Sequence, residues 1–178
     1  MRKGIMLRFG ASLGACLLVA LLGSLVTTPE VPNWYATLNK PWFMPPDYLF
    51  APVWTALYLM MGVSGFLVWN RVALARQEQR AETDEPEPDR PGGPLVAGTA
   101  AMVLFGIQLG LNLLWSILFF GLHLPFLAFM DILLLVAAIV GAMLAFQHIS
   151  RAAALLLAPY LAWVAFAGVL NYEMWVRN

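Results

Sequence analysis

The sequence predicts an all-α membrane protein, built as a bundle of five transmembrane helices. Of its 178 residues, 61% are hydrophobic and 11% are charged, whereas an ordinary soluble domain carries about 25% charged residues. A helix needs roughly 20 consecutive apolar residues to cross about 30 Å of hydrocarbon. Four stretches without Asp, Glu, Lys or Arg reach that length: 9–29, 48–70, 91–130 and 152–172.

The expected helices follow from these stretches in chain order. The third stretch is long enough for two crossings, and it breaks between Gly121 and Pro125, because proline suits the first turn of a helix, where its missing N–H costs nothing. We therefore expect a single domain, residues 1–178, with helices over 5–27, 48–70, 94–120, 125–147 and 152–173.

The charged residues indicate the orientation of the bundle and exclude one class of partner. Ten basic residues balance ten acidic ones, so there is no bulk positive field for binding nucleic acid. The positive-inside rule places the N-terminus in the cytoplasm of a cell membrane, a bacterial one in the first instance. An outer membrane is the alternative, for which the rule is weaker. The basic residues at the expected cytoplasmic end are Arg2, Lys3, Arg8, Arg71, Arg76, Arg80, Arg90 and Arg151, against Lys40 and Arg177 at the other end.

Two connections are longer than usual. Residues 76–94 are acidic and rich in proline, which predicts a solvated tether or, alternatively, a docking segment for a partner. The segment 30–47 instead combines Trp34, Tyr35 and Trp42 with four prolines, which stiffen the backbone. It is interpreted either as an aromatic belt at the membrane interface or as a lid over the bundle.

Polar and aromatic residues recur at helical spacing inside three of the expected spans. Trp54 and Tyr58 are four residues apart. The spacing indicates an inward face on each helix, which forms either polar contacts between helices or the wall of a cavity for a flat, mainly apolar ligand with a few polar atoms. The other two faces are Gln108, Asn112, Trp115 and Phe119, and Pro159, Trp163, Ala167 and Asn171.

The remaining candidate sites are weaker. Asp131 lies inside the fourth span, where a carboxylate is costly, and it is either a hydrogen-bonded structural residue or a ligand contact. His123 and His148 lack the further partners that a metal or haem iron would need, so neither a metal site nor a required cofactor is expected. Gly106 and Gly110 fit a helix-packing motif, which favours either a homodimer or internal packing. Leu170, Tyr172 and Arg177 fit a loose cholesterol-recognition pattern.

Several blocks of the sequence, taken together, resemble the translocator protein / tryptophan-rich sensory protein family (TspO/MBR). The first loop and second helix carry Trp34-Tyr35, Lys40-Pro41-Trp42, Pro45-Pro46, Val53-Trp54 and Leu57-Tyr58. The later helices carry Asn112-Leu113-Leu114-Trp115, Phe119-Phe120-Gly121, a run from Asp131 to Val136, Pro159-Tyr160-Leu161-Ala162-Trp163 and Leu170-Asn171-Tyr172. The likeness runs from about residue 30 to the end of the chain, and the 76–94 linker departs from it.

The resemblance implies a five-helix bundle, usually dimeric, that binds porphyrins, cholesterol and synthetic ligands of the benzodiazepine and isoquinoline types, with the first loop closed over the pocket. It implies sterol recognition by Leu170, Tyr172 and Arg177. The pocket residues that it implies are Tyr35, Pro46, Trp54, Tyr58, Asn112, Trp115, Trp163 and Ala167.

We therefore expect a membrane receptor or carrier for tetrapyrroles and sterols. A light-dependent oxidase that degrades porphyrin, with Trp54 and Trp163 as its reactive indoles, is the second hypothesis, and it too comes from the resemblance. A small-solute exporter or a stabiliser of a larger membrane complex is the third, with the acidic linker as the contact to the partner.

Overall fold

The computed structural model describes residues 2–82 and 94–178. All the secondary structure in these ranges is helical. Five helical stretches are long and apolar enough to cross a membrane: Arg2–Glu30, Asp47–Gln79, Ala97–Gly121, Pro125–Ile149 and Arg151–Arg177. The predicted fold class is therefore confirmed.

The elements are α1 (Arg2–Glu30), α2 (Trp34–Thr37), η1 (Asp47–Leu49), α3 (Phe50–Glu82), α4 (Pro94–Ser116), η2 (Ile117–Gly121), α5 (Pro125–Ile149), α6 (Arg151–Leu156) and α7 (Ala158–Arg177). The break before Pro125 is where the sequence places it. The helix of the fifth span is interrupted at Leu157, two residues before Pro159, because proline lacks the N–H that continues a helix. A π-helical turn, η2, ends the α4 span.

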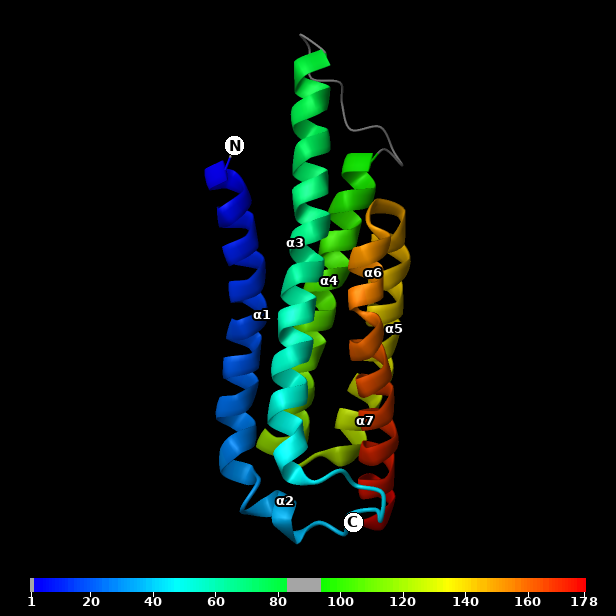
Figure 1. Ribbon diagram of the computed structural model, residues 1–178. Helices are drawn as coiled ribbons and strands as arrows, with labels where there is room; N and C mark the ends of the chain where they lie inside the picture. The colour runs from blue at the N-terminus through cyan, green and yellow to red at the C-terminus, as the bar shows by residue number, and fades with distance from the viewer. Residues whose placement is uncertain (1, 83–93) are drawn as a thin grey trace.

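The second membrane span, which is formed by α3, is longer than expected. It continues beyond residue 70 to Glu82, so the first part of the predicted 76–94 tether is helical. Arg, Gln and Glu are good helix formers, and this segment projects from the bundle as an extension of α3 (Figure 1). The rest of the predicted tether, residues 83–93, lies outside the described residues.

The helices run side by side in an elongated bundle, with the two chain ends at opposite ends of it (Figure 1). α4 packs along α5, and α5 packs along α7, while α1 lies against α3. Residues with small side chains allow α1 to approach α3 closely. The Ser12 hydroxyl donates a 2.8 Å hydrogen bond to the Gly62 carbonyl, and a Cβ built on Gly62 would lie 3.0 Å from the Leu13 Cα.

Residues 30–47, which we call the lid, cross the end of the bundle near the C-terminus (Figure 1). The lid contains the short helix α2. Tyr35 on α2 is buried and packs with Phe119, Phe120, Leu170 and Met174 in a hydrophobic cluster separate from the main core. The lid is therefore a packed part of the fold rather than a solvated connection.

Candidate ligand-binding cavity

A cavity of about 390 Å³ lies beneath the lid, within the range of roughly 300–1,000 Å³ that is usual for small-molecule sites. Its wall is made by α1, the lid, α3, α4 with η2, and α7. Most of the lining side chains are apolar or aromatic, with several hydroxyls, one amide and the carboxylate of Asp47. This composition is typical of sites for flat, mainly apolar ligands.

Aromatic rings form two sides of the cavity. Trp54 and Tyr58 on α3 lie one turn apart, with their ring centroids 5.7 Å from each other. The second side comes from α4 and η2, where Trp115 stacks on Phe119 at 5.5 Å and Phe120 meets Trp115 edge-on at 5.8 Å. The π-helical turn brings both phenylalanines into the interior although they are adjacent in sequence. These rings offer planar surfaces on which a conjugated ligand can stack.

The polar part of the cavity is a hydrogen-bonded chain that joins three helices. The Tyr58 hydroxyl on α3 donates to Asn112 Oδ1 on α4. Asn112 Nδ2 donates in turn to the Tyr160 hydroxyl on α7, at 3.1 Å. Tyr58 and Asn112 line the cavity, whereas Tyr160 is fully buried behind them. The chain fixes the rotamers of the two lining side chains, which are placed to contact a polar atom of a ligand.

A second polar contact holds the indole of Trp115. Its Nε1 donates to Asn171 Oδ1 at 3.1 Å, and Asn171 Nδ2 donates to the Pro125 carbonyl at 2.7 Å. One buried amide on α7 thereby joins α4 to the start of α5. Because the indole N–H already has a partner, Trp115 presents its ring to the cavity in a fixed orientation.

The lid closes the cavity with a buried tyrosine. Tyr35 lines the cavity, and its hydroxyl donates to Met44 Sδ at 3.6 Å. The Lys40 ammonium lies 3.9 Å from the centroid of the Tyr35 ring and 4.0 Å from the Asp47 carboxylate. Burial, together with the negative charge of Asp47, raises the pKa of Tyr35 from 10 to about 12. The Tyr35 hydroxyl is therefore protonated at neutral pH and able to donate.

The cavity is open toward the surroundings of the bundle on one side. Among its lining residues, Ser24 and Thr28 on α1 are exposed, as are Ala51 and Thr55 on α3. The α7 residues Leu170 and Met174, in contrast, are buried. These exposed lining residues belong to the lid-proximal halves of α1 and α3, so the cavity reaches the protein surface at this edge, which we call the opening between α1 and α3.

The structure brings together most of the ligand-binding residues that the sequence and the resemblance suggested. Those that line the cavity are Tyr35, Trp54, Tyr58, Asn112, Trp115 and Ala167. Pro46 does not line it, although its neighbour Asp47 does. Pro46 instead is exposed where the lid ends, and its carbonyl accepts a hydrogen bond from the Leu49 N–H at 3.0 Å.

Trp163 and Asp131 lie outside the cavity wall. The Trp163 indole packs between Phe50 and Phe166, with both centroids 5.9 Å away. The spacing of Trp163 and Ala167 predicted that both side chains would face the cavity. In the structure Ala167 lines the cavity, and Phe50 at the start of α3 lines it where Trp163 does not. Asp131 is buried on α5, and within the described part of the chain neither carboxylate oxygen has a hydrogen-bond partner.

The three residues of the predicted sterol segment do not share a face. Leu170 is 3% exposed and lines the cavity. Tyr172 points outward and packs against Phe129 and Trp175. Arg177 is exposed and pairs with Glu173 at 2.7 Å. The pattern therefore spans an inner and an outer surface of α7.

Gly106 and Gly110 leave an open strip on the surface of α4, because a Cβ built on either one would meet nothing within 4 Å. In the described ranges no three His, Cys, Asp or Glu side chains are arranged to hold a metal ion.

Sequence reasoning did not identify the contribution of α1. Ser24, Thr27 and Thr28 line the cavity with their hydroxyls. Their spacing of three and four residues puts them on one helix face, and hydroxyls gathered on one face of an otherwise apolar helix were the available signal. Met44 of the lid was also missed, since a methionine in a loop indicates nothing by itself.

Comparison with known proteins identifies the family. A model of the TspO/MBR family matches residues 12–176. The tryptophan-rich protein TspO of Chlorobaculum tepidum is 42% identical over 167 residues, which cover 93% of this chain and 92% of the relative. The protein of the same name from Archaeoglobus fulgidus is 36% identical over 172 residues, 97% of each chain. The translocator protein of Bos taurus is 36% identical over 157 residues, 88% of this chain and 82% of the relative. The chain therefore belongs to the TspO/MBR family and is an integral, multi-pass membrane protein.

Proposed function

We propose that the chain is a membrane receptor or carrier, with a sensory or transport role, that binds tetrapyrroles such as protoporphyrin and haem in the lidded cavity. The observation that carries the proposal is the combination of aromatic rings on two sides of the cavity with the hydrogen-bonded Tyr58–Asn112 pair, which joins α3 to α4. A planar conjugated ligand can stack on the rings while one of its polar atoms meets the hydroxyl or the amide.

The opening between α1 and α3 supports a ligand that reaches the cavity from the bilayer. Ser24, Thr28 and Thr55 give this opening hydroxyls in an otherwise apolar surface. An amphiphile can therefore pass with its polar edge next to the hydroxyls and its apolar body in the membrane. A ligand larger than the cavity can extend through the same opening.

A cholesterol-like sterol is a second ligand class for this proposal. The outer aromatic group on α5 and α7 presents Tyr172 and Trp175, with Phe126 and Phe129 beside them. Flat rings at the end of a span suit the rigid face of a sterol or a lipid tail. Leu170, on the cavity side of α7, is not part of this outer group.

Two other functions have less support. A light-dependent oxidase with both Trp54 and Trp163 at the porphyrin would need Trp163 next to the ligand, and Trp163 is outside the cavity wall. An exporter or complex stabiliser acting through the acidic linker would depend on residues 83–93, which lie outside the described residues.

Membrane placement and assembly are part of the same proposal. The N-terminus lies in the cytoplasm by the positive-inside rule, which puts the lid on the far side of a cell membrane, with an outer membrane as the alternative. A homodimer forms through the open strip at Gly106 and Gly110, because glycine allows two helix backbones to approach closely.

Parallel titration of detergent-purified protein with protoporphyrin, haem and cholesterol tests the function. Binding of protoporphyrin in the cavity predicts a shifted Soret absorption band, quenched tryptophan fluorescence and saturation at one ligand per chain. Cholesterol that binds only the outer aromatic group leaves the porphyrin titration unchanged. If protoporphyrin produces no saturable change, the tetrapyrrole function is wrong.

A further inference from the structure

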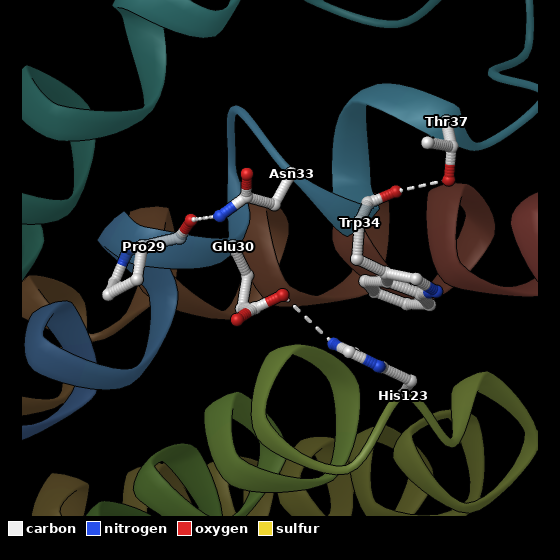
Figure 2. A network of polar contacts seen from close by, with 6 residues as sticks. All are labelled: Pro29, Glu30, Asn33, Trp34, Thr37 and His123. Carbon is white, nitrogen blue, oxygen red and sulfur yellow. Dashed lines mark hydrogen bonds and ion pairs between the residues drawn. The ribbon is translucent and has the colours of Figure 1, made fainter.

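The lid is joined to the rest of the bundle by a small group of side chains at its first turn, shown in Figure 2. Glu30 ends α1, Trp34 begins α2, and His123 lies in the turn between η2 and α5. Glu30 Oε2 and His123 Nε2 are 3.0 Å apart. The Trp34 and His123 rings are stacked, with centroids 4.3 Å apart and planes 17° from parallel. We call these three residues the latch.

The backbone is arranged to place these side chains. His123 has a φ of 56°, and it is the one non-glycine residue with a positive φ in the described ranges, a conformation that costs energy for most residues and that histidine adopts more readily than most. Asn33 Nδ2 donates to the Pro29 carbonyl at 2.8 Å, and Thr37 Oγ1 donates to the Trp34 carbonyl at 2.7 Å (Figure 2). These bonds fix both ends of the turn that carries Trp34.

The latch is continuous with the cavity. Trp34 meets Phe119 edge-on at 5.2 Å, and Phe119 lines the cavity and stacks on Trp115. A change in the Trp34–His123 stack is therefore transmitted directly to an aromatic ring of the ligand site. The next residue, Tyr35, is itself part of the cavity wall.

We propose that the Glu30–His123–Trp34 latch holds the lid closed over the cavity, and that the charge of His123 sets how readily the lid opens and a ligand leaves. This regulation rests on the function proposed above. Protonated His123 forms an ion pair with Glu30 and a cation–π contact with Trp34. Neutral His123 keeps a hydrogen bond to the Glu30 carboxylate and a weaker stack on Trp34, but it loses the ion pair. Acidification therefore closes the lid, and alkalinisation loosens it.

Other charged groups around the latch do not replace this pair. The turn that carries His123 and the first turn of α5 contain no charged side chain. In the lid, Lys40 is near Asp47 and the Tyr35 ring. At the end of α7, Glu173 pairs with Arg177. Histidine side chains in general change charge between about pH 5 and pH 8, so the measurement compares two pH values within that interval.

The lid position can be measured without a ligand. Nitroxide labels on A36C in the lid and A165C on α7, in a C16A background, give a distance distribution by pulsed electron resonance, since both positions are exposed. We expect a narrow distribution at about pH 5.5 and a broader one at about pH 8. E30Q and H123Q should give a broad distribution at both values. H123R keeps a permanent charge that can pair and stack, so its distribution should stay narrow at both.

The second histidine is the matched control. His148 lies in the last turn of α5, at the opposite end of the bundle, so H148Q should keep the full pH response. A distribution that is the same at both pH values in the unsubstituted latch, or a response that survives in H123Q, would overturn the proposal.

Ligand release distinguishes this proposal from the proposed function. Protoporphyrin should dissociate about two- to fivefold more slowly at the acidic pH, which is the scale of one partly exposed ion pair, and H123R should abolish the difference. A lid that responds to pH in a protein that binds no protoporphyrin supports the latch and contradicts the tetrapyrrole function. Bound protoporphyrin whose release rate is independent of pH contradicts the latch alone.

Discussion

The individual residues that matter most in this protein are those that place a polar atom among aromatic rings. Asn112 accepts from Tyr58 and donates to Tyr160, and Asn171 holds the Trp115 indole. A buried amide with both of its groups paired is favourable in a membrane bundle, because no water competes for those groups. Each amide therefore fixes a ring or hydroxyl that a ligand would contact.

Tyr35 gives a prediction at the residue scale. Its pKa is raised to about 12 by burial and by the nearby Asp47 carboxylate, whereas an unfolded tyrosine titrates near 10. Between about pH 10 and pH 12 the folded protein therefore keeps the Tyr35 proton that the unfolded chain loses. The contribution of Tyr35 to the free energy of unfolding is complete below about pH 10 and falls as the pH rises toward 12. Absorption at 295 nm should show one late-titrating tyrosine fewer in Y35F than in the unsubstituted protein.

The same titration has a matched variant. D47N removes the negative charge near Tyr35 and leaves its burial in place, so the Tyr35 pKa should fall slightly and remain above 10. A Tyr35 that titrates at about 10 in the intact protein would show that the lid does not bury the ring against the bundle.

At the scale of the elements, sequence predicted the spans better than their ends. Four runs without charge, the third of them divided at Pro125, predicted five spans, and α5 begins at Pro125. The extension of α3 to Glu82 was missed because a polar segment of good helix formers has the same composition as a solvated linker.

The inward faces show a similar limit. The Gln108–Phe119 face is buried, as its spacing indicates, but Gln108 is enclosed by the core away from the cavity. Trp163 is also outside the cavity wall, whereas Phe50, which contacts its ring from another helix, is part of the wall. Helical periodicity gives the direction of a side chain, and it does not give which neighbour fills the position in front of it.

The approach of α1 to α3 gives a prediction at the element scale. A Cβ on Gly65 would lie 2.8 Å from Ser12 Oγ and 2.9 Å from Phe105 Cε1. G65L should therefore force α1 away from α3 and lower the free energy of unfolding by about 1–3 kcal/mol, the usual range for an overpacked core. Thermal unfolding in detergent measures the change. G14L is the control, since a Cβ there meets nothing within 4 Å, and equal losses in both variants would contradict the close packing.

At the scale of the whole molecule, the arrangement is a bundle with one weakly enclosed side. α1 is the least buried of the five spans. Its lid-proximal half borders the opening to the cavity. The cavity is therefore bounded in two places, by the opening between α1 and α3 and by the lid at the end of the bundle. The proposed latch acts on the lid.

The proposed dimer is tested at the same scale. If two copies meet through the open strip on α4, G106L/G110L should convert the dimer to a monomer while leaving the fold of each copy intact. Light scattering of the detergent-solubilised protein measures the mass. G10L/G14L, on the equally open face of α1, should remain dimeric. A dimer that persists in G106L/G110L would place the interface elsewhere.

The central claim is that a tetrapyrrole binds in the cavity beneath the lid, and a matched pair of substitutions on α7 tests it most directly. Ala167 lines the cavity, whereas Ala165, two residues away, is exposed on the outside of the bundle. A167W fills the cavity, and it should weaken protoporphyrin binding in the Soret titration by at least about tenfold, equivalent to about 1.4 kcal/mol. A165W should bind as the unsubstituted protein does. Equal affinity in A167W and A165W would contradict the account.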